Sequence, residues 1–171
     1  MPTVNLSATM KPTKHFKLLL TQAMFTKRTQ FLAAAILLKQ RGGYRYVVLH
    51  LVCQGMEIIQ KALLLAHSYD TFKPQIAKRA LFGHDLIKGA DAVSATYGLR
   101  PISGALRSEL EQLNHYYMEH LLRYASPADI LIDGDSISYT RVLKRCCALV
   151  RFGSKKIKTP TNSPPPASPA P

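Results

Sequence analysis

The feature that most constrains this chain is the segment from Tyr44 to Ser68, which is apolar on nearly every side of a helix. A surface helix carries one apolar stripe, whereas a helix that is apolar all round must be covered by other elements. We therefore predict a helix over residues 44–68 that lies at the centre of the fold. Its five polar side chains argue against a membrane span, and we expect no membrane contact: they are His50, Gln54, Glu57, Gln60 and Lys61.

Apolar residues at helical spacing predict further helices on both sides of this segment. Phe31, Ala34, Ala35 and Leu38 share one face of the first, which Gly42 and Gly43 would end. Pro74 predicts a loop over residues 69–74. The predicted helices cover residues 13–40, 44–68, 75–97 with a break near Gly83, 101–124 and 136–152. The sequence thus predicts an all-α antiparallel up-down bundle of four to five helices.

The two ends of the chain differ in composition from the predicted bundle. Residues 1–12 are polar, and we expect them to be frayed. Residues 153–171 are rich first in Lys and then in Pro and Ser, so they lack the apolar side chains that a core needs. We predict one helical domain over residues 13–152, followed by a basic and then Pro-rich disordered tail.

Charge is distributed unevenly along the sequence. There are 23 Lys and Arg against 10 Asp and Glu, with no acid before Glu57 and none after Asp135. Both ends are therefore cationic, while the middle is close to neutral. A cationic surface attracts phosphate backbones and other anionic partners. An excess of Lys and Arg can equally serve only to keep a chain soluble.

The chain has three cysteines, Cys53, Cys146 and Cys147, without a CxxC spacing. This pattern favours neither a disulfide framework nor a zinc site. Cys53 and Cys146 fall on apolar helical faces, where we expect them to act as small core residues. A reducing compartment fits this use of cysteine. Residues 1–10 contain no apolar secretory segment, and we expect a cytoplasmic protein.

Four polar residues of the central segment, His50, Gln54, Glu57 and Lys61, are spaced by 4, 3 and 4 and so share one helical face. Glu57 and Lys61 form an i, i+4 pair in the favourable order. One interpretation is a solvated edge of the helix. The other is a polar cleft that faces later helices, or a dimer interface, in which the charges would need partners.

Histidines elsewhere are the remaining candidates for chemistry. His84 and Asp85 adjoin each other in a Gly-His-Asp-Leu segment, and His can act as acid, base or ligand near neutral pH. His115 and His120 are five residues apart, which turns them about 140° from each other on a helix. We therefore expect no shared metal, and no nucleotide-binding or hydrolase motif predicts a cofactor.

The segment CQGMEIIQKALLL, from Cys53 to Leu65, resembles the signature of HEPN domains, the higher-eukaryote and prokaryote nucleotide-binding family. That signature is a central helix with a Glu, followed by Lys-Ala-Leu-Leu. Gly83 to Leu86 is similar to the GHDL segment of the family, and Tyr117 and Arg123-Tyr124 match its later Tyr and Arg-Tyr. The resemblance covers roughly residues 26–152.

The resemblance implies a helical bundle that is commonly dimeric. It implies binding of RNA or of a nucleotide, or pairing with a partner nucleotidyltransferase or antitoxin of a toxin or defence system. We expect the binding residues to be Glu57, Lys61, His84, Asp85 and Arg123, around a cleft between helices. Two alternatives remain: a metal-independent endoribonuclease of toxin type, and a protein-interaction scaffold without a ligand.

The nuclease alternative depends on the family's catalytic motif, an Arg followed four to six residues later by His. Arg123 best matches the position of that Arg, yet no His follows it. The strings Arg45 to His50 and Arg79 to His84 have the required spacing, and only the second adjoins the GHDL segment. His84 as base and Arg79 as phosphate ligand are therefore the candidate catalytic residues.

Overall fold

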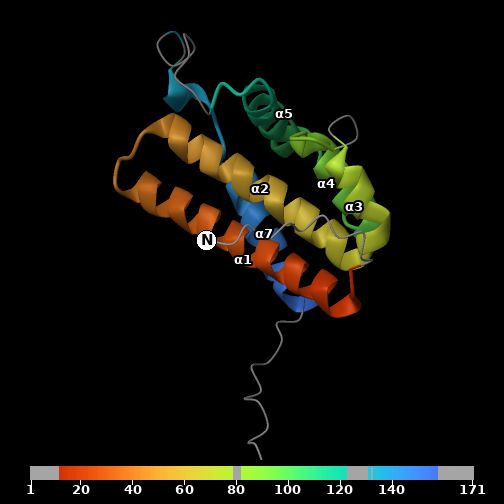
Figure 1. The fold of residues 1–171 in the computed structure, drawn as a ribbon. Helices are drawn as coiled ribbons and strands as arrows, with labels where there is room; N and C mark the ends of the chain where they lie inside the picture. Colours follow the sequence, from red (N-terminus) through yellow and green to blue (C-terminus); the bar gives the residue numbers. More distant parts are fainter. Residues whose placement is uncertain (1–11, 79–81, 123–130, 132, 158–171) are drawn as a thin grey trace, which may run out of the picture.

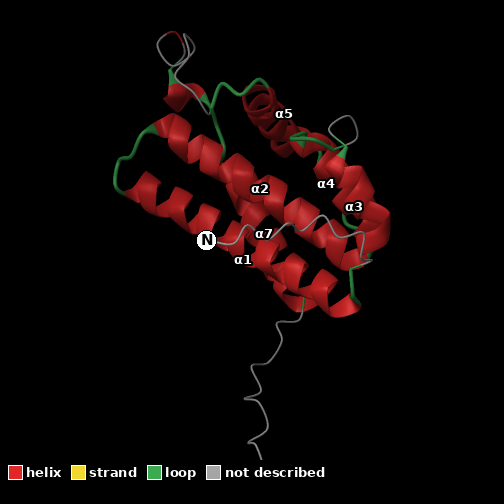
Figure 2. Cartoon of the chain, in the orientation of Figure 1, coloured by secondary structure: helices red, strands yellow, loops and turns green. Residues whose placement is uncertain are grey.

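The computed structural model describes residues 12–78, 82–122, 131 and 133–157, which form a helical bundle (Figure 1). Its α-helices are α1 (Lys14–Gln40), α2 (Arg45–His67), α3 (Tyr69–Ala77), α4 (Leu86–Tyr97), α5 (Gly104–Met118) and α7 (Thr140–Lys156), and η1 (Gly134–Ser136) is a 3-10 helix. Figure 2 shows only helices and loops over these described ranges, so the predicted all-α class is confirmed. The predictions for residues 1–11 and 158–171 lie outside the described residues.

Helix α2 is the centre of the bundle, as its composition predicts. It contacts α1, α3, α4, α5, α7 and η1, and Figure 1 shows it lying along α1. Leu49, Val52, Ile59 and Leu63 are fully buried. By length and composition alone α2 could cross a bilayer, but 67% of its apolar window is buried inside the bundle, as in the core helix of a soluble protein.

Capping signals in the sequence define α1. The Thr13 hydroxyl accepts a hydrogen bond from the Phe16 amide at 3.2 Å, which satisfies one of the first free N–H groups of the helix. At the other end Gly42 adopts a φ of +66°, and the Gly43 amide donates to the Leu38 carbonyl at 2.8 Å. This left-handed position is one that glycine adopts without steric cost. The predicted start and end of the helix are confirmed.

The region between α2 and α4 differs from the prediction. Residues 69–74, predicted as a loop because of Pro74, belong to α3. Pro74 is the sixth residue of α3 and lacks the N–H that would bond to the Asp70 carbonyl, so this nine-residue helix gives up one internal hydrogen bond. Helix α3 ends at Ala77 and α4 begins at Leu86, so the predicted 75–97 helix is divided around the expected break at Gly83.

Helices α5 and α7 are shifted relative to their predicted bounds. Helix α5 begins three residues after Pro101 and ends at Met118, where His120 adopts the left-handed conformation. Helix α7 continues to Lys156, beyond the predicted end at Phe152. Gly153 does not stop it, because this glycine is buried against the ring of Phe25 in α1, where any Cβ would collide. Residues 153–156, predicted as the start of the tail, therefore belong to α7.

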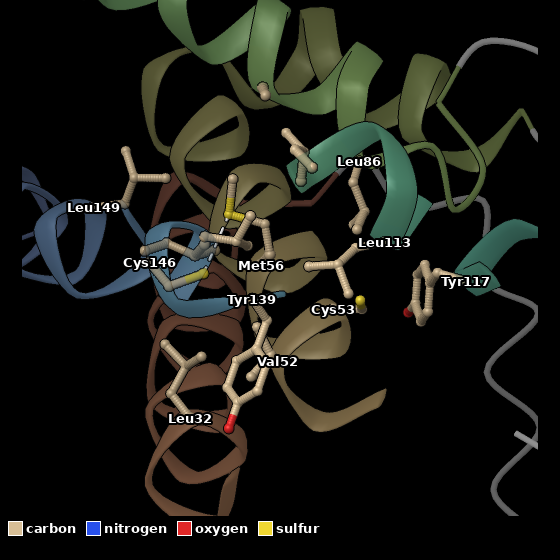
Figure 3. Packing of buried hydrophobic residues seen from close by; sticks show 14 of the residues in the cluster. Leu32, Val52, Cys53, Met56, Leu86, Leu113, Tyr117, Tyr139, Cys146 and Leu149 are labelled. Atoms are coloured by element: carbon tan, nitrogen blue, oxygen red, sulfur yellow. Dashed lines mark hydrogen bonds between the residues drawn. The ribbon is translucent and has the colours of Figure 1, made fainter. Parts of the chain in front are cut away.

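Cysteines take part in the core, as predicted. Cys53 and Cys146 are fully buried free thiols, and burial raises the pKa of both. Figure 3 shows Cys146 of α7 against Met56 of α2, with 3.3 Å between the two sulfur atoms. Leu32 of α1 and Leu149 of α7 belong to the same core. A thiol with a raised pKa is a poor nucleophile, so these groups serve packing.

Candidate functional site

Glu57 is a buried carboxylate on α2 that receives polar side chains from three directions. Only 7% of the surface of this residue is exposed to solvent. One oxygen accepts from Lys61 Nζ at 2.5 Å, and the other accepts from the Tyr117 hydroxyl at 2.5 Å. Nδ1 of His84 lies 3.0 Å from that second oxygen. Glu57 therefore does not lie on a solvated edge of α2 but contacts side chains from α5 and from the α3–α4 connection.

The charge state of Glu57 follows from two opposing effects. Burial by itself raises the pKa of a carboxyl, because it disfavours the charged form. Hydrogen bonds from Lys61, Tyr117 and His84 outweigh that effect, and the net pKa of Glu57 is lowered from its ordinary value of 4.5. Glu57 is thus ionised at neutral pH, and its negative charge is balanced within the protein by the ammonium group of Lys61.

Lys61 joins α2 to the turn that precedes α4. Besides its bond to Glu57, Nζ donates to the Gly83 carbonyl at 2.6 Å. An ammonium group has three donors, so two of those of Lys61 are occupied by the protein. Lys61 therefore fixes the position of the Gly83–His84 turn against α2.

His84 is the member of the network that reaches solvent, with 36% of its side chain exposed. A carboxylate at Nδ1 favours the tautomer with the proton on that nitrogen, which leaves the Nε2 lone pair available. The ring lies edge-on to the rings of Tyr117 and His120, each with a centroid separation of 5.9 Å. Glu57 therefore orients the imidazole in the way that a buried carboxylate orients a general base.

Asp85, predicted as a binding residue, lies next to this network and caps α4. Its Oδ1 accepts from the Ile87 and Lys88 amides at 3.0 and 3.1 Å and from the Asn114 side chain at 3.3 Å. The two amide contacts satisfy free N–H groups at the start of the helix. Arg79 and Arg123, the other two predicted site residues, lie outside the described residues.

The other two residues of the stripe, Gln54 and His50, also lie against Tyr117. Gln54 Oε1 lies 2.8 Å from the Tyr117 hydroxyl, and the His50 ring stands 5.8 Å from the Tyr117 ring. Both side chains are half-buried. The spacing of positions 50, 54, 57 and 61 was the signal that grouped them with Glu57. Arg45, which precedes His50 in the other Arg-x4-His string, instead donates to the carbonyls of Gly134 and Ile137.

His120 is the site residue that sequence reasoning missed. It follows α5 with a φ of +59°, and the amides of His120 and Leu121 close the helix by bonding to the carbonyls of Tyr117 and Tyr116. Glycine is the usual residue at this position, and a side chain there costs about 1–2 kcal/mol. Nδ1 of His120 is buried and has no hydrogen-bond partner in the part of the chain that the structure describes.

The same described ranges contain no group of three His, Cys, Asp or Glu side chains arranged to hold a metal ion. The cluster formed by Gln54, Glu57, Lys61, His84, Tyr117 and His120, called here the Glu57 network, joins a buried carboxylate to a half-exposed imidazole. Comparison with protein-family models, with curated proteins and with solved structures finds no match for this chain.

Proposed function

We propose that this chain is a HEPN-like module that binds RNA or a nucleotide at the Glu57 network. The observation that carries the proposal is the meeting of the two segments on which the resemblance rests. Glu57 bonds to His84, and Lys61 bonds to Gly83, although these segments are separated by more than 20 residues in sequence. Tyr117, the later Tyr of the resemblance, bonds to the same carboxylate.

The charge of the network suits an anionic ligand. The carboxylate of Glu57 is paired with the ammonium group of Lys61, which offsets its repulsion of a phosphate. His84 is the member of the network that reaches solvent, beside the ring of His120, and an imidazole N–H is a donor for phosphate oxygens. The chain also carries a net charge of +13, which raises the local concentration of polyanions.

Binding is testable by fluorescence anisotropy of a 5′-labelled 12-nucleotide single-stranded RNA, with ATP as competitor. His84→Ala removes the exposed imidazole, and we expect the Kd to rise about tenfold or more, the value of one hydrogen bond to a charged group. His115→Ala is the matched control, because His115 is an exposed histidine of α5 outside the network. Equal Kd values for wild type and His84→Ala would contradict binding at the Glu57 network. An absence of RNA binding by wild type would favour the scaffold alternative.

A metal-independent endoribonuclease is the second candidate, and the oriented imidazole favours it. In this activity His84, held by Glu57, would accept a proton from a 2′-hydroxyl, and His120, whose ring centroid is 5.9 Å from that of His84, would return a proton to the leaving oxygen. Arg79 would bind the phosphate. Cleavage of RNA in EDTA, lost in His84→Ala and in Arg79→Ala, would support this activity. Full cleavage by both variants would contradict it.

The proposal also includes an antiparallel up-down bundle that forms a homodimer in the cytoplasm, beside a partner nucleotidyltransferase or antitoxin. The dimer and the partner come with the HEPN resemblance, whereas the bundle topology rests on the helical spacing and the location on the sequence of residues 1–10. Light scattering after size exclusion measures the oligomeric state directly: a mass of twice 19.0 kDa supports the dimer, and a mass of 19.0 kDa contradicts it.

A further inference from the structure

A second surface, on helix α7, carries cations that the Glu57 network does not use. Arg141, Lys144, Arg151 and Lys155 are exposed. At 100° per residue they fall within an arc of about 80°, and at 1.5 Å per residue they extend over about 21 Å. They form one straight stripe along the outside of the helix, called here the α7 stripe.

The positive charge of the α7 stripe is largely uncompensated. Arg141 lies 3.4 Å from the buried carboxylate of Glu109. Lys144, Arg151 and Lys155 form no ion pair within the described residues. Helix α7 itself contains no acid, and neither does α1, which packs against it. Helix α5 also contacts α7, but of its acids Glu109 reaches only Arg141 of the stripe and Glu111 pairs with Arg107.

The opposite face of α7 is committed to the core. Val142, Cys146, Leu149 and Gly153 are buried, and none of the exposed large hydrophobic side chains of the described residues belongs to α7. A helix that binds a membrane surface needs a free apolar face to insert. A protein interface likewise needs apolar or aromatic anchors at its centre. Neither is present on the α7 stripe, whereas a phosphate backbone requires only a row of cations.

We propose that the α7 stripe binds the phosphate backbone of RNA as a contact separate from the Glu57 network. The two surfaces lie on different sides of α2, since Met56 contacts Cys146 of α7 while the adjacent Glu57 faces His84 and Tyr117. The choice of RNA as the polyanion rests on the proposed function. The stripe supplies affinity without sequence preference, and the Glu57 network holds one nucleotide.

The test compares Arg151→Gln/Lys155→Gln with Lys73→Gln/Arg100→Gln in the full chain. Each pair removes one Arg and one Lys, and the control residues are exposed and lie outside α1 and α7. Binding of the labelled 12-nucleotide RNA is measured from 50 to 200 mM salt. Each phosphate contact adds about 0.7 to the slope of log K against log salt for single strands, so the α7 pair should lower the slope by about 1.4. The control pair should leave it unchanged.

Each result separates the α7 stripe from the Glu57 network. A lower salt slope for the α7 pair, together with an unchanged Kd for His84→Ala, would support the α7 stripe as an RNA contact and contradict the Glu57 network as the RNA site. Equal salt slopes for wild type and the α7 pair, or an equal fall in slope for the α7 and control pairs, would overturn the proposal that the α7 stripe binds RNA. Wild-type binding to vesicles of phosphatidylserine and phosphatidylcholine, without binding to RNA, would overturn it in favour of a membrane surface.

Discussion

Replacement of Arg28 by Met should stabilise the fold, because Arg28 is a buried cation without an acidic partner among the described residues. Only 1% of the residue is exposed. Its guanidinium lies over the Phe25 ring and donates to the Phe25 carbonyl at 3.1 Å, while Nε has no hydrogen-bond partner within the described ranges. Burial lowers the pKa of Arg28 from 12.5 to about 10.

The size of the effect follows from that pKa. A depression of about 2.5 units, at 1.36 kcal/mol per unit, means that burial disfavours the cation by about 3 kcal/mol at neutral pH. Met fills a similar volume without a charge but loses the hydrogen bond to Phe25, worth about 1 kcal/mol. We therefore expect the free energy of unfolding of Arg28→Met to exceed that of wild type by about 2 kcal/mol, as for other buried charges replaced by apolar residues.

Urea denaturation followed by circular dichroism at pH 7 measures this difference. Lys27→Met is the control, since Lys27 is an exposed cation on the same helix and its loss should change stability by less than about 0.5 kcal/mol. The sign of the pH dependence is a second check. The unfolded state binds the extra proton between pH 10 and 12.5, so wild type should gain stability relative to Arg28→Met as pH rises through 10. A variant less stable than wild type would refute the reasoning.

Three further changes test other parts of the structure. His120→Gly should raise the free energy of unfolding by about 1 kcal/mol, because glycine adopts the left-handed conformation without strain, and it should weaken RNA binding. Urea denaturation measures the first effect and the anisotropy assay the second. A variant less stable than wild type would contradict the claim that His120 is strained. Glu109→Ala should lower stability by about 1–3 kcal/mol, because its carboxylate accepts from the Val142 amide and the Ser138 hydroxyl at 2.8 Å each; an unchanged thermal midpoint would argue against this cap. The pKa of Glu57 is lowered in the folded state, so its charged form stabilises the fold at pH values above the ordinary pKa of 4.5. That stability is lost as pH falls through the lower folded pKa. Wild type should therefore lose more free energy of unfolding than Glu57→Gln between pH 7 and pH 3.

The parts of the fold that the sequence predicted are those with a local signal. The apolar composition of α2 predicted its central place, and Thr13 and Gly42 marked the ends of α1. The bounds of α5 and α7 depend on long-range contacts. The helix was predicted to end just before Gly153, but this glycine lies inside α7 because it packs against the ring of Phe25. Pro74 likewise predicted a loop, although a short helix accommodates it.

Helical spacing could predict the candidate site only within one helix, and His84 was joined to it by the resemblance alone. Spacing grouped Glu57 and Lys61 with Gln54 and His50, since these four share a face of α2. Tyr117 was singled out only by the resemblance, because spacing does not show that its hydroxyl meets a carboxylate 60 residues earlier. His120 had no signal, since its value depends on the backbone conformation that follows α5.

The central place of α2 has a consequence for synthesis. Helices α1 and α7 both cover α2, yet they are at opposite ends of the described chain. Because about 90 residues separate the last residue of α2 from the last residue of α7, a ribosome adding roughly 5–20 residues per second leaves α2 without this cover for roughly 4–18 s. During that interval the most apolar segment of the nascent chain is the one that chaperones or aggregation would capture. A transcript truncated before residue 140 should therefore yield insoluble product.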